Sequence, residues 1–180
     1  MMIGNLMRYV FLLPLLCGGG AIAHTVILPG GTVHMTGSVI GGACAVSTES
    51  EDKKVLMGQV RNNQFKELGS WADPVAFSLE LVNCDTKISQ QVGMIFTGVL
   101  DGKDPLVFHA GEGPEAAKGV GIGIFDSSGS LIVPETKAQH LTLLQNGTVT
   151  VPLMAKYRAT DRIVEGGDAS AVVYFSLYYP

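Results

Sequence analysis

Basic residues are scarce in this sequence: among 180 residues, 12 lysines and arginines stand against 16 aspartates and glutamates. A protein that binds nucleic acid usually presents a basic surface, so this balance argues against a nucleic-acid partner. Long apolar runs are scarce too. After the first 23 residues, no run is apolar for long enough to cross a membrane as a helix.

Patterns that carry chemistry are also missing. No serine lies in a G-x-S-x-G motif, and there is no C-x-x-C pair. Gly119 and Gly121 fit two positions of the nucleotide-binding pattern G-x-G-x-x-G, but Ile124 takes the third, and no strand–turn–helix context surrounds them. No two of the four histidines lie at metal-ligand spacing: His24, His34, His109 and His140. We therefore expect no catalytic site, no metal and no cofactor. The alternating glycines indicate instead a strand face that another chain or sheet approaches closely.

Residues 1–23 have the features of a secretory signal. Arg8 supplies a positive charge, YVFLLPLLC supplies a short apolar core, and AIA at 21–23 supplies the small residues before a cleavage site. We predict cleavage after Ala23. Cys17 offers a lipoprotein alternative, but the residue before a lipidated cysteine should be small, and Leu16 is not. The stronger interpretation is that Cys17 is discarded with the signal.

Two cysteines then remain, Cys44 and Cys84. An isolated pair in an exported chain predicts one disulfide. The bond would close a loop of about 40 residues, which the chain-entropy model values at roughly 4 kcal/mol of stability.

Apolar side chains alternate along short segments that are separated by glycine, proline and polar residues. This period of two predicts an antiparallel sandwich or barrel, with no long amphipathic helix and no second domain. The predicted strands lie in residues 75–82, 92–99, 120–125, 130–134, 140–144, 148–159 and 170–179. The predicted buried faces contain Val75, Phe77, Leu79 and Leu81 in the first strand and Val149, Val151, Leu153, Ala155 and Tyr157 in the sixth. Residues 109–118 are expected to form a loop with one helical turn.

The two ends of the mature chain complement each other. The last predicted strand is apolar and aromatic and runs to the C-terminus, so nothing follows it to pair with its free edge. The stretch that begins at residue 24 is also apolar and strand-like. One end would need a strand and the other would offer one, which is β-strand addition between chains. Repeated head to tail, such a contact builds a filament.

Several motifs carry a family resemblance. Three of them are GGTVHMTGSVIGGACAV at 30–46, LVNCDT at 81–86 and AKYRAT at 155–160. Two single residues accompany them: a penultimate aromatic, Tyr179, and Gly167, fourteen residues from the C-terminus. Together they resemble the type 1 fimbrial (pilin) subunits that the chaperone–usher route assembles. LPGG at 28–31 and YRATDR at 157–162 are closer to the minor fimbrin-like subunits of that family than to the major pilin.

The resemblance implies an all-β fold: an incomplete immunoglobulin-like sandwich that lacks its last strand and is completed by a donor strand from another chain. It implies a signal peptide at 1–23, an N-terminal donor-strand extension at 24–36 and a pilin domain at 37–180. The implied partners are a periplasmic pilus chaperone, an outer-membrane usher and other pilin subunits. The implied route is export to the periplasm, followed by incorporation into a fimbrium on the cell surface.

The same resemblance assigns roles to residues at both ends. The inserting face of the donor strand would contain Ile27, Gly31, Val33 and Met35. The acceptor groove and chaperone-binding strand would contain Gly167, Val173, Phe175, Leu177 and Tyr179. At the donor glycine, the missing side chain permits close backbone approach. Pro29 has no amide proton and removes one rung of the new sheet, which leaves the N-terminal limit of the inserted segment open.

Three interpretations remain at this stage. The first is a structural subunit of a type 1-like adhesive pilus, either a shaft component or a minor subunit that regulates, anchors or terminates the rod. The second is a carbohydrate-binding tip adhesin, although such adhesins usually carry an additional lectin domain and this length accommodates one domain. The third, a secreted sandwich enzyme, lacks a recognisable site.

Overall fold

The computed structural model describes residues 30–33, 35 and 41–180, and the chain divides into two units after Ser38. In the first unit, the described residues are exposed and belong to no helix or strand. The predicted signal segment, its cleavage site and Ile27 lie outside the described residues. The second unit contains every element named below.

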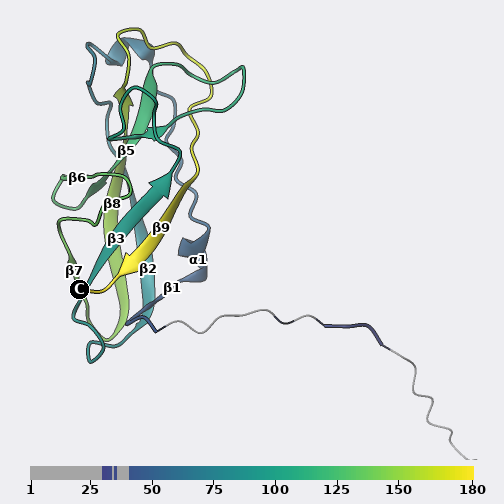
Figure 1. Cartoon of the computed structure of the whole chain (residues 1–180), viewed down its shortest axis with the longest axis vertical. Helices are drawn as coiled ribbons and strands as arrows, with labels where there is room; N and C mark the ends of the chain where they lie inside the picture. The colour runs from purple at the N-terminus through teal and green to yellow at the C-terminus, as the bar shows by residue number, and fades with distance from the viewer. Residues whose placement is uncertain (1–29, 34, 36–40) are drawn as a thin grey trace, which may run out of the picture. The chain divides into compact units, whose positions relative to one another are not determined.

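Short strands dominate the second unit, as Figure 1 shows. Its two helical elements, α1 (Thr48–Glu51) and the 3₁₀ helix η1 (Asn62–Gln64), each make about one turn and were not predicted. Among the described residues, no helix is long and apolar enough to cross a membrane. The strands are β1 (Ala45–Val46), β2 (Val75–Cys84), β3 (Gln91–Gly98), β4 (Phe108–His109), β5 (Val120–Asp126), β6 (Leu131–Ile132), β7 (Thr142–Leu143), β8 (Gly147–Ala159) and β9 (Val173–Tyr178).

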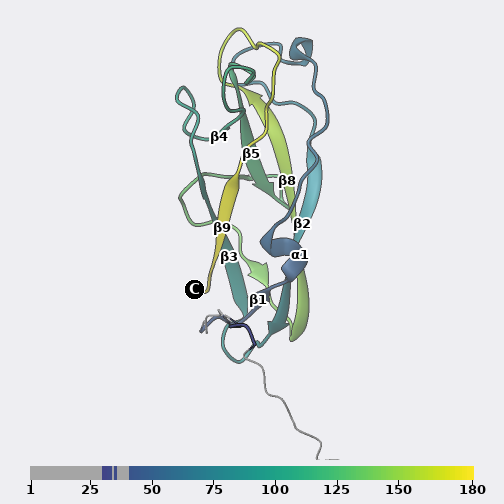
Figure 2. The same ribbon diagram turned by 90° about the vertical axis from the view of Figure 1, so that its right-hand side faces the viewer.

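The strands form two antiparallel sheets that face each other. One sheet has the order β1-β2-β8-β5-β4, with β6 also paired to β5, and the other has the order β7-β3-β9. Figure 2 shows the two layers from the side, with β3 and β9 in one and β2 and β8 in the other. The predicted all-β sandwich is therefore confirmed.

The core lies between the two sheets and follows the predicted alternation. Leu79 and Leu81 of β2 are buried, and so is every second residue of β8 from Val149 to Ala159. Leu79, Leu81 and the β8 residues Val149, Val151 and Leu153 meet Val92 and Phe96 of the opposite sheet in one apolar cluster, whereas Ala155 and Tyr157 belong to a second cluster. Period-two patterning in the sequence thus identifies the inner faces of the long strands.

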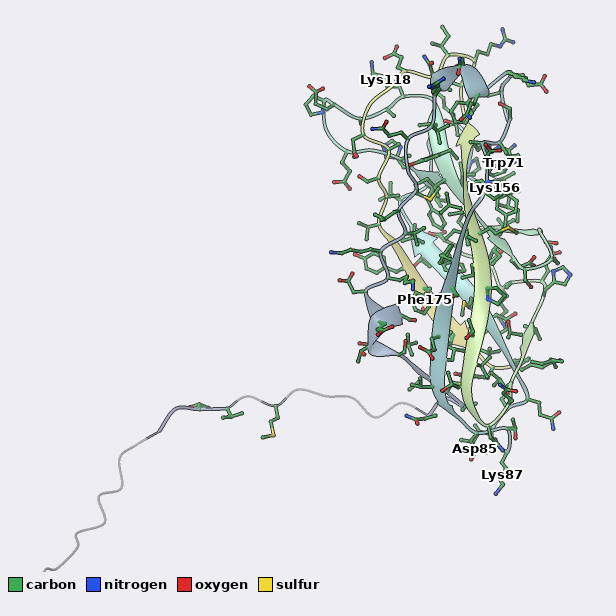
Figure 3. The ribbon with its side chains drawn as sticks, turned by 180° about the vertical axis from the view of Figure 1, so that it is seen from behind. Trp71, Asp85, Lys87, Lys118, Lys156 and Phe175 are labelled. Carbon is green, nitrogen blue, oxygen red and sulfur yellow. A yellow bond between two sulfur atoms is a disulfide. The ribbon has the colours of Figure 1, made fainter. Side chains whose placement is uncertain are left out.

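The glycines of β5 are closely approached, as predicted. A Cβ on Gly123 would come within 2.6 Å of the Trp71 ring, and a Cβ on Gly121 would come within 2.4 Å of Val107. Both neighbours belong to the same chain, so the approaching side chains are intramolecular at these two positions. Trp71 also packs edge-on against Phe125 at 4.8 Å between ring centroids, and Figure 3 shows it close to Lys156 on the outer face of this sheet.

The loop at 109–118 contains no helical turn, which corrects that part of its prediction. It instead forms backbone hydrogen bonds with the segment before β9. The amide of Ala117 donates to the carbonyl of Asp168 at 2.7 Å, and the amide of Gly111 donates to the carbonyl of Ser170 at 2.7 Å. The loop therefore holds the start of the last strand in place.

The predicted disulfide is present between Cys44, just before β1, and Cys84, at the end of β2. Both cysteines are buried, with exposed fractions of 4% and 5%. The bond joins residues 40 positions apart. It therefore fixes the entry of the chain into the domain against the end of a central strand.

Replacing Cys44 and Cys84 together by alanine should lower the free energy of unfolding by about 4 kcal/mol, because the unfolded chain gains the entropy of an open loop. Equilibrium unfolding in guanidinium chloride measures the difference. Free thiols at both positions in exported material, detected by alkylation and mass spectrometry, would contradict the pairing.

Candidate functional site

A groove of about 1570 Å³ opens along one side of the sandwich. One wall is formed by residues 164–175, which lead into β9, and the other by residues 51–62 and Phe65. The floor consists of residues from the inner faces of both sheets: Phe77, Leu79, Phe96, Val120, Ile122, Ile124, Ala155 and Tyr157. The groove thus leads directly to the hydrophobic core between the two sheets.

The first wall is a strand with one unpaired edge. Among the strands that the structure describes, β9 pairs with β3 alone, from Gly93 opposite Tyr178 to Gly98 opposite Val173. Its side chains alternate as predicted: Val173 and Phe175 line the groove and are half-buried, whereas Tyr174 is 69% exposed. The free edge offers amide and carbonyl groups to a further strand.

Phe175 is the last residue of this wall and is labelled in Figure 3. Its ring lies 6.3 Å from that of Phe96, centroid to centroid, and it packs against the core cluster. Leu177 and Tyr179 pack against the same cluster but do not line the groove. All four alternating residues of the predicted acceptor face therefore contact the core, and Val173 and Phe175 also border the open groove.

The second wall is a segment without secondary structure. Residues 52–60 form no backbone or side-chain hydrogen bond with any described residue. Met57 and Val60 pack inward against a second apolar cluster, and Leu56 is 87% exposed. Gly58 has φ of +70°, a left-handed conformation that glycine adopts without a steric penalty and that interrupts an extended edge. The sequence analysis missed this wall because the segment shows no regular alternation.

At the end of the groove away from the disulfide, the first wall is held by the 109–118 loop. The amide of Asp168 donates to the carbonyl of Glu115 at 2.8 Å, and the Tyr157 hydroxyl donates to the carbonyl of Ala169 at 3.2 Å. Burial, and to a smaller extent the carboxylate of Asp168, raises the pKa of Tyr157, so its hydroxyl keeps the proton that this bond requires. This part of the wall is therefore firmly positioned.

Gly167 lies at this same end, six residues before β9. A Cβ on Gly167 would come within 2.5 Å of both the Ala117 nitrogen and the Glu115 oxygen, which are backbone atoms. The adjacent Gly166 has no atom within 4 Å of the corresponding position. The glycine at 167 is thus required by close contact between the loop and the wall.

Changing Gly167 to alanine should destabilise the domain by about 2 kcal/mol, because the backbone of the loop must move to admit the methyl group. Changing Gly166 to alanine is the matched control and should have little effect. Thermal unfolding of the two variants measures the difference, and equal melting temperatures would show that the contact does not require glycine.

Tyr179 lies beyond the residues that line the groove and joins the C-terminus to the start of the domain. Its hydroxyl accepts a hydrogen bond from the Cys44 amide at 3.1 Å and donates one to the Cys44 carbonyl at 3.2 Å. A Cβ on Gly42 would lie 3.1 Å from the tyrosine ring. The C-terminus and the start of the domain are thus in direct contact beside the disulfide.

Three of the four predicted donor residues are among the described residues. Val33 and Met35 are 77% and 90% exposed, and Gly31 is exposed as well. None of the three belongs to a strand of this single chain. Their predicted role is insertion into a second chain.

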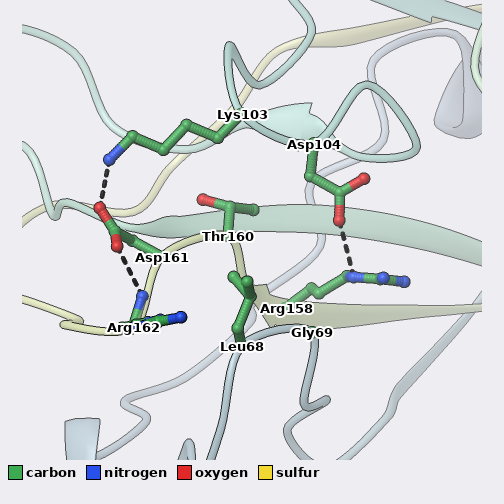
Figure 4. A pocket seen from close by; sticks show the side chains of 8 residues that line it. All are labelled: Leu68, Gly69, Lys103, Asp104, Arg158, Thr160, Asp161 and Arg162. Carbon is green, nitrogen blue, oxygen red and sulfur yellow. Dashed lines mark hydrogen bonds and ion pairs between the residues drawn. The ribbon is translucent and has the colours of Figure 1, made fainter.

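A second, shallower hollow of about 510 Å³ lies on the surface near the end of β8 (Figure 4). Its charged groups pair with each other: Lys103 with Asp161, and Arg158 Nε with Asp104 Oδ2 at 2.8 Å. Within the described part of the chain, no cluster of three or more His, Cys, Asp or Glu residues is arranged to hold a metal. The apolar groove remains the strongest candidate site, and its chemistry suits an extended apolar segment that supplies backbone hydrogen bonds.

The comparisons with known proteins that follow all concern fimbrial or pilus proteins. The family model described as fimbrial protein matches residues 33–180. The chain is 40% identical over 161 residues to the fimbrin-like protein FimI of Salmonella typhi, covering 88% of this chain and 90% of that protein. It is 36% identical to the type-1 fimbrial protein C chain of Escherichia coli, covering 83% of each. A solved chaperone–usher pilus structure shares the fold, with a TM-score of 0.65, 23% identity and coverage of 88% of this chain and 100% of that chain.

Proposed function

The chain belongs to the fimbrial protein family, and on this premise we propose that it joins a type 1-like pilus by taking a strand from one neighbour and giving a strand to another. Members of this family are structural pilins, so the chain is not an enzyme. Fimbrial subunits are components of surface pili. We also propose that the chain enters the periplasm after signal cleavage. A chaperone captures it there, and an usher then receives it.

The groove is the observation that carries this proposal. Its floor is core, its first wall has an unpaired strand edge, and its second wall has unpaired backbone groups. A strand inserted between these walls would hydrogen-bond to β9 and place alternate side chains on the apolar floor. The same insertion would satisfy backbone groups that the isolated domain leaves to water.

The donor is the extension at 24–36 of the next subunit. The expected inserting face contains Ile27, Gly31, Val33 and Met35, and the exposure of Val33 and Met35 in the single chain is consistent with that use. Fully extended, 13 residues span about 43 Å at roughly 3.3 Å per residue, which is sufficient to follow a strand-lined groove. Because donor and acceptor surfaces differ, the contact repeats head to tail.

We further propose that the subunit has a minor role, anchoring, regulating or terminating the rod, instead of forming its bulk or carrying a sugar-binding tip. The resemblance of LPGG at 28–31 and YRATDR at 157–162 to minor fimbrin-like subunits supports this choice. A tip adhesin would bind glycans on an array. A shaft component would form long filaments from this subunit alone.

Strand capture provides the direct test. The exported protein, refolded from denaturant with a synthetic peptide of residues 24–36 or with the matching peptides of type-1 fimbrial relatives, should form a complex that resists SDS without boiling. A peptide of the same composition in scrambled order is the control. If no member of the panel forms a resistant complex, the groove is not a strand acceptor.

A further inference from the structure

Tyr179 makes an unusual connection between distant parts of the chain. Its hydroxyl bonds both backbone groups of Cys44, 135 residues away in sequence. Within the described residues, these are the only hydrogen bonds between the segment from β9 to the C-terminus and residues 41–62. One phenol therefore provides all of the hydrogen bonding between the C-terminal segment that continues the first wall and the segment that leads into the second wall.

Cys44 can serve as the anchor because it is fixed from its other side. Its sulfur is bonded to Cys84 at the end of β2, and the Asp85 amide donates to the carbonyl of Ala43 at 2.8 Å. β2 belongs to the larger sheet, whereas β9 belongs to the three-stranded sheet. The link from Cys84 through Cys44 to Tyr179 thus joins β2 of the larger sheet to the C-terminus, which follows β9 of the three-stranded sheet.

We propose that Tyr179 is a positioning residue for strand capture, through which the Cys44–Cys84 disulfide sets the separation of the groove walls. The proposal rests on the strand-acceptor function proposed above. With the disulfide in place, the Cys44 backbone is held where the phenol can bond it, and the walls have a fixed spacing at one end. Without the disulfide, Cys44 loses its covalent hold on β2 and the phenol loses a fixed partner.

Fixed spacing matters because the inserted strand must meet two surfaces at once. It has to pair with the free edge of β9 while its side chains reach the floor beside residues 52–60. A wall free to move away leaves one of these sets of contacts unmade.

The test compares two tyrosine-to-phenylalanine variants in the full exported chain. Tyr179→Phe removes both bonds to Cys44. Tyr178→Phe is the matched control, because the Tyr178 hydroxyl donates a single bond at 2.8 Å to the carbonyl of Ala138, away from the disulfide. The probe is whichever peptide of the panel above forms most SDS-resistant complex with the unaltered chain.

We expect Tyr179→Phe to lower the rate of peptide capture, measured per molecule of folded protein, about tenfold. The reason is that two hydrogen bonds are lost at a site that must stay rigid. Tyr178→Phe should change the rate by about twofold or less, because its single hydrogen bond lies away from the groove. In the Cys44→Ala/Cys84→Ala background, adding Tyr179→Phe should cause little further loss, since both changes break the same link. Hydrogen exchange of the Cys44 amide should accelerate in Tyr179→Phe and stay unchanged in Tyr178→Phe.

Additive effects of Tyr179→Phe and the cysteine pair would overturn the proposal, as would equal capture rates for the two phenylalanine variants. These results require that the unaltered chain captures the peptide. If it captures none, the strand-acceptor function itself is wrong, so the failure of either idea is recognisable.

Discussion

Changing Phe175 to aspartate is expected to abolish strand capture and to prevent accumulation of the exported protein. The ring of Phe175 packs against Phe96 and the core, so its removal alone costs about 3 kcal/mol or more. A carboxylate facing the groove floor adds a desolvation penalty of several kcal/mol, roughly doubling that loss. Co-purification with a co-expressed periplasmic pilus chaperone, per molecule of exported subunit, measures the effect.

Ser176 supplies the control for this experiment. It lies next in the strand, faces outward and is exposed, opposite Ile95 on β3. Ser176→Asp introduces the same charge without burying it, so the variant should still be captured. Equal loss for both variants would mean that any charge on β9 is harmful and that the groove face has no special role.

Deleting residues 24–35 is expected to separate the two proposed activities completely. Cys44, Cys84 and all of the described strands lie outside the deleted segment, so the domain should fold with its disulfide and take up a donor peptide. The shortened chain has no strand to give, so it should not join an acceptor subunit in SDS-resistant form. Mixing tagged full-length and shortened subunits and analysing unboiled samples by electrophoresis measures both activities.

The control for this deletion is the full-length chain carrying the same tag, which should both accept and donate. An SDS-resistant joint formed by the shortened chain acting as the donor would place the donor strand elsewhere in the sequence. Failure of the shortened chain to fold would show that residues 24–35 contribute to the domain.

The long strands and their inner faces were predictable because burial imposes a period of two. Alternation in residues 75–82 and 148–159 correctly identified Leu79, Leu81 and the inner face of β8 as buried, whereas Val75 and Phe77 are half-buried. The cysteine pairing was predictable as well, since export left only two candidates.

Features that depend on contacts between distant segments were not predictable. The glycines of β5 are small because Trp71 and Val107 pack on them, and nothing near them in the sequence indicates those neighbours. The 109–118 loop was expected to contain a helical turn, but its hydrogen bonds go to residues 165–170. The second wall of the groove pairs with no strand in the described part of the chain, so no pairing shaped its sequence into a regular pattern.

The direction of the groove has a mechanical consequence. The groove runs along residues 164–175, so a strand seated in it lies lengthwise beside that segment, which includes the first three residues of β9. Tension applied to the ends of a filament would pull such a strand along its own axis. Its hydrogen bonds and buried side chains would then bear the load together, in shear, whereas a strand peeled from one end breaks its bonds one at a time. An open groove of this orientation is therefore suited to a joint that must withstand pulling.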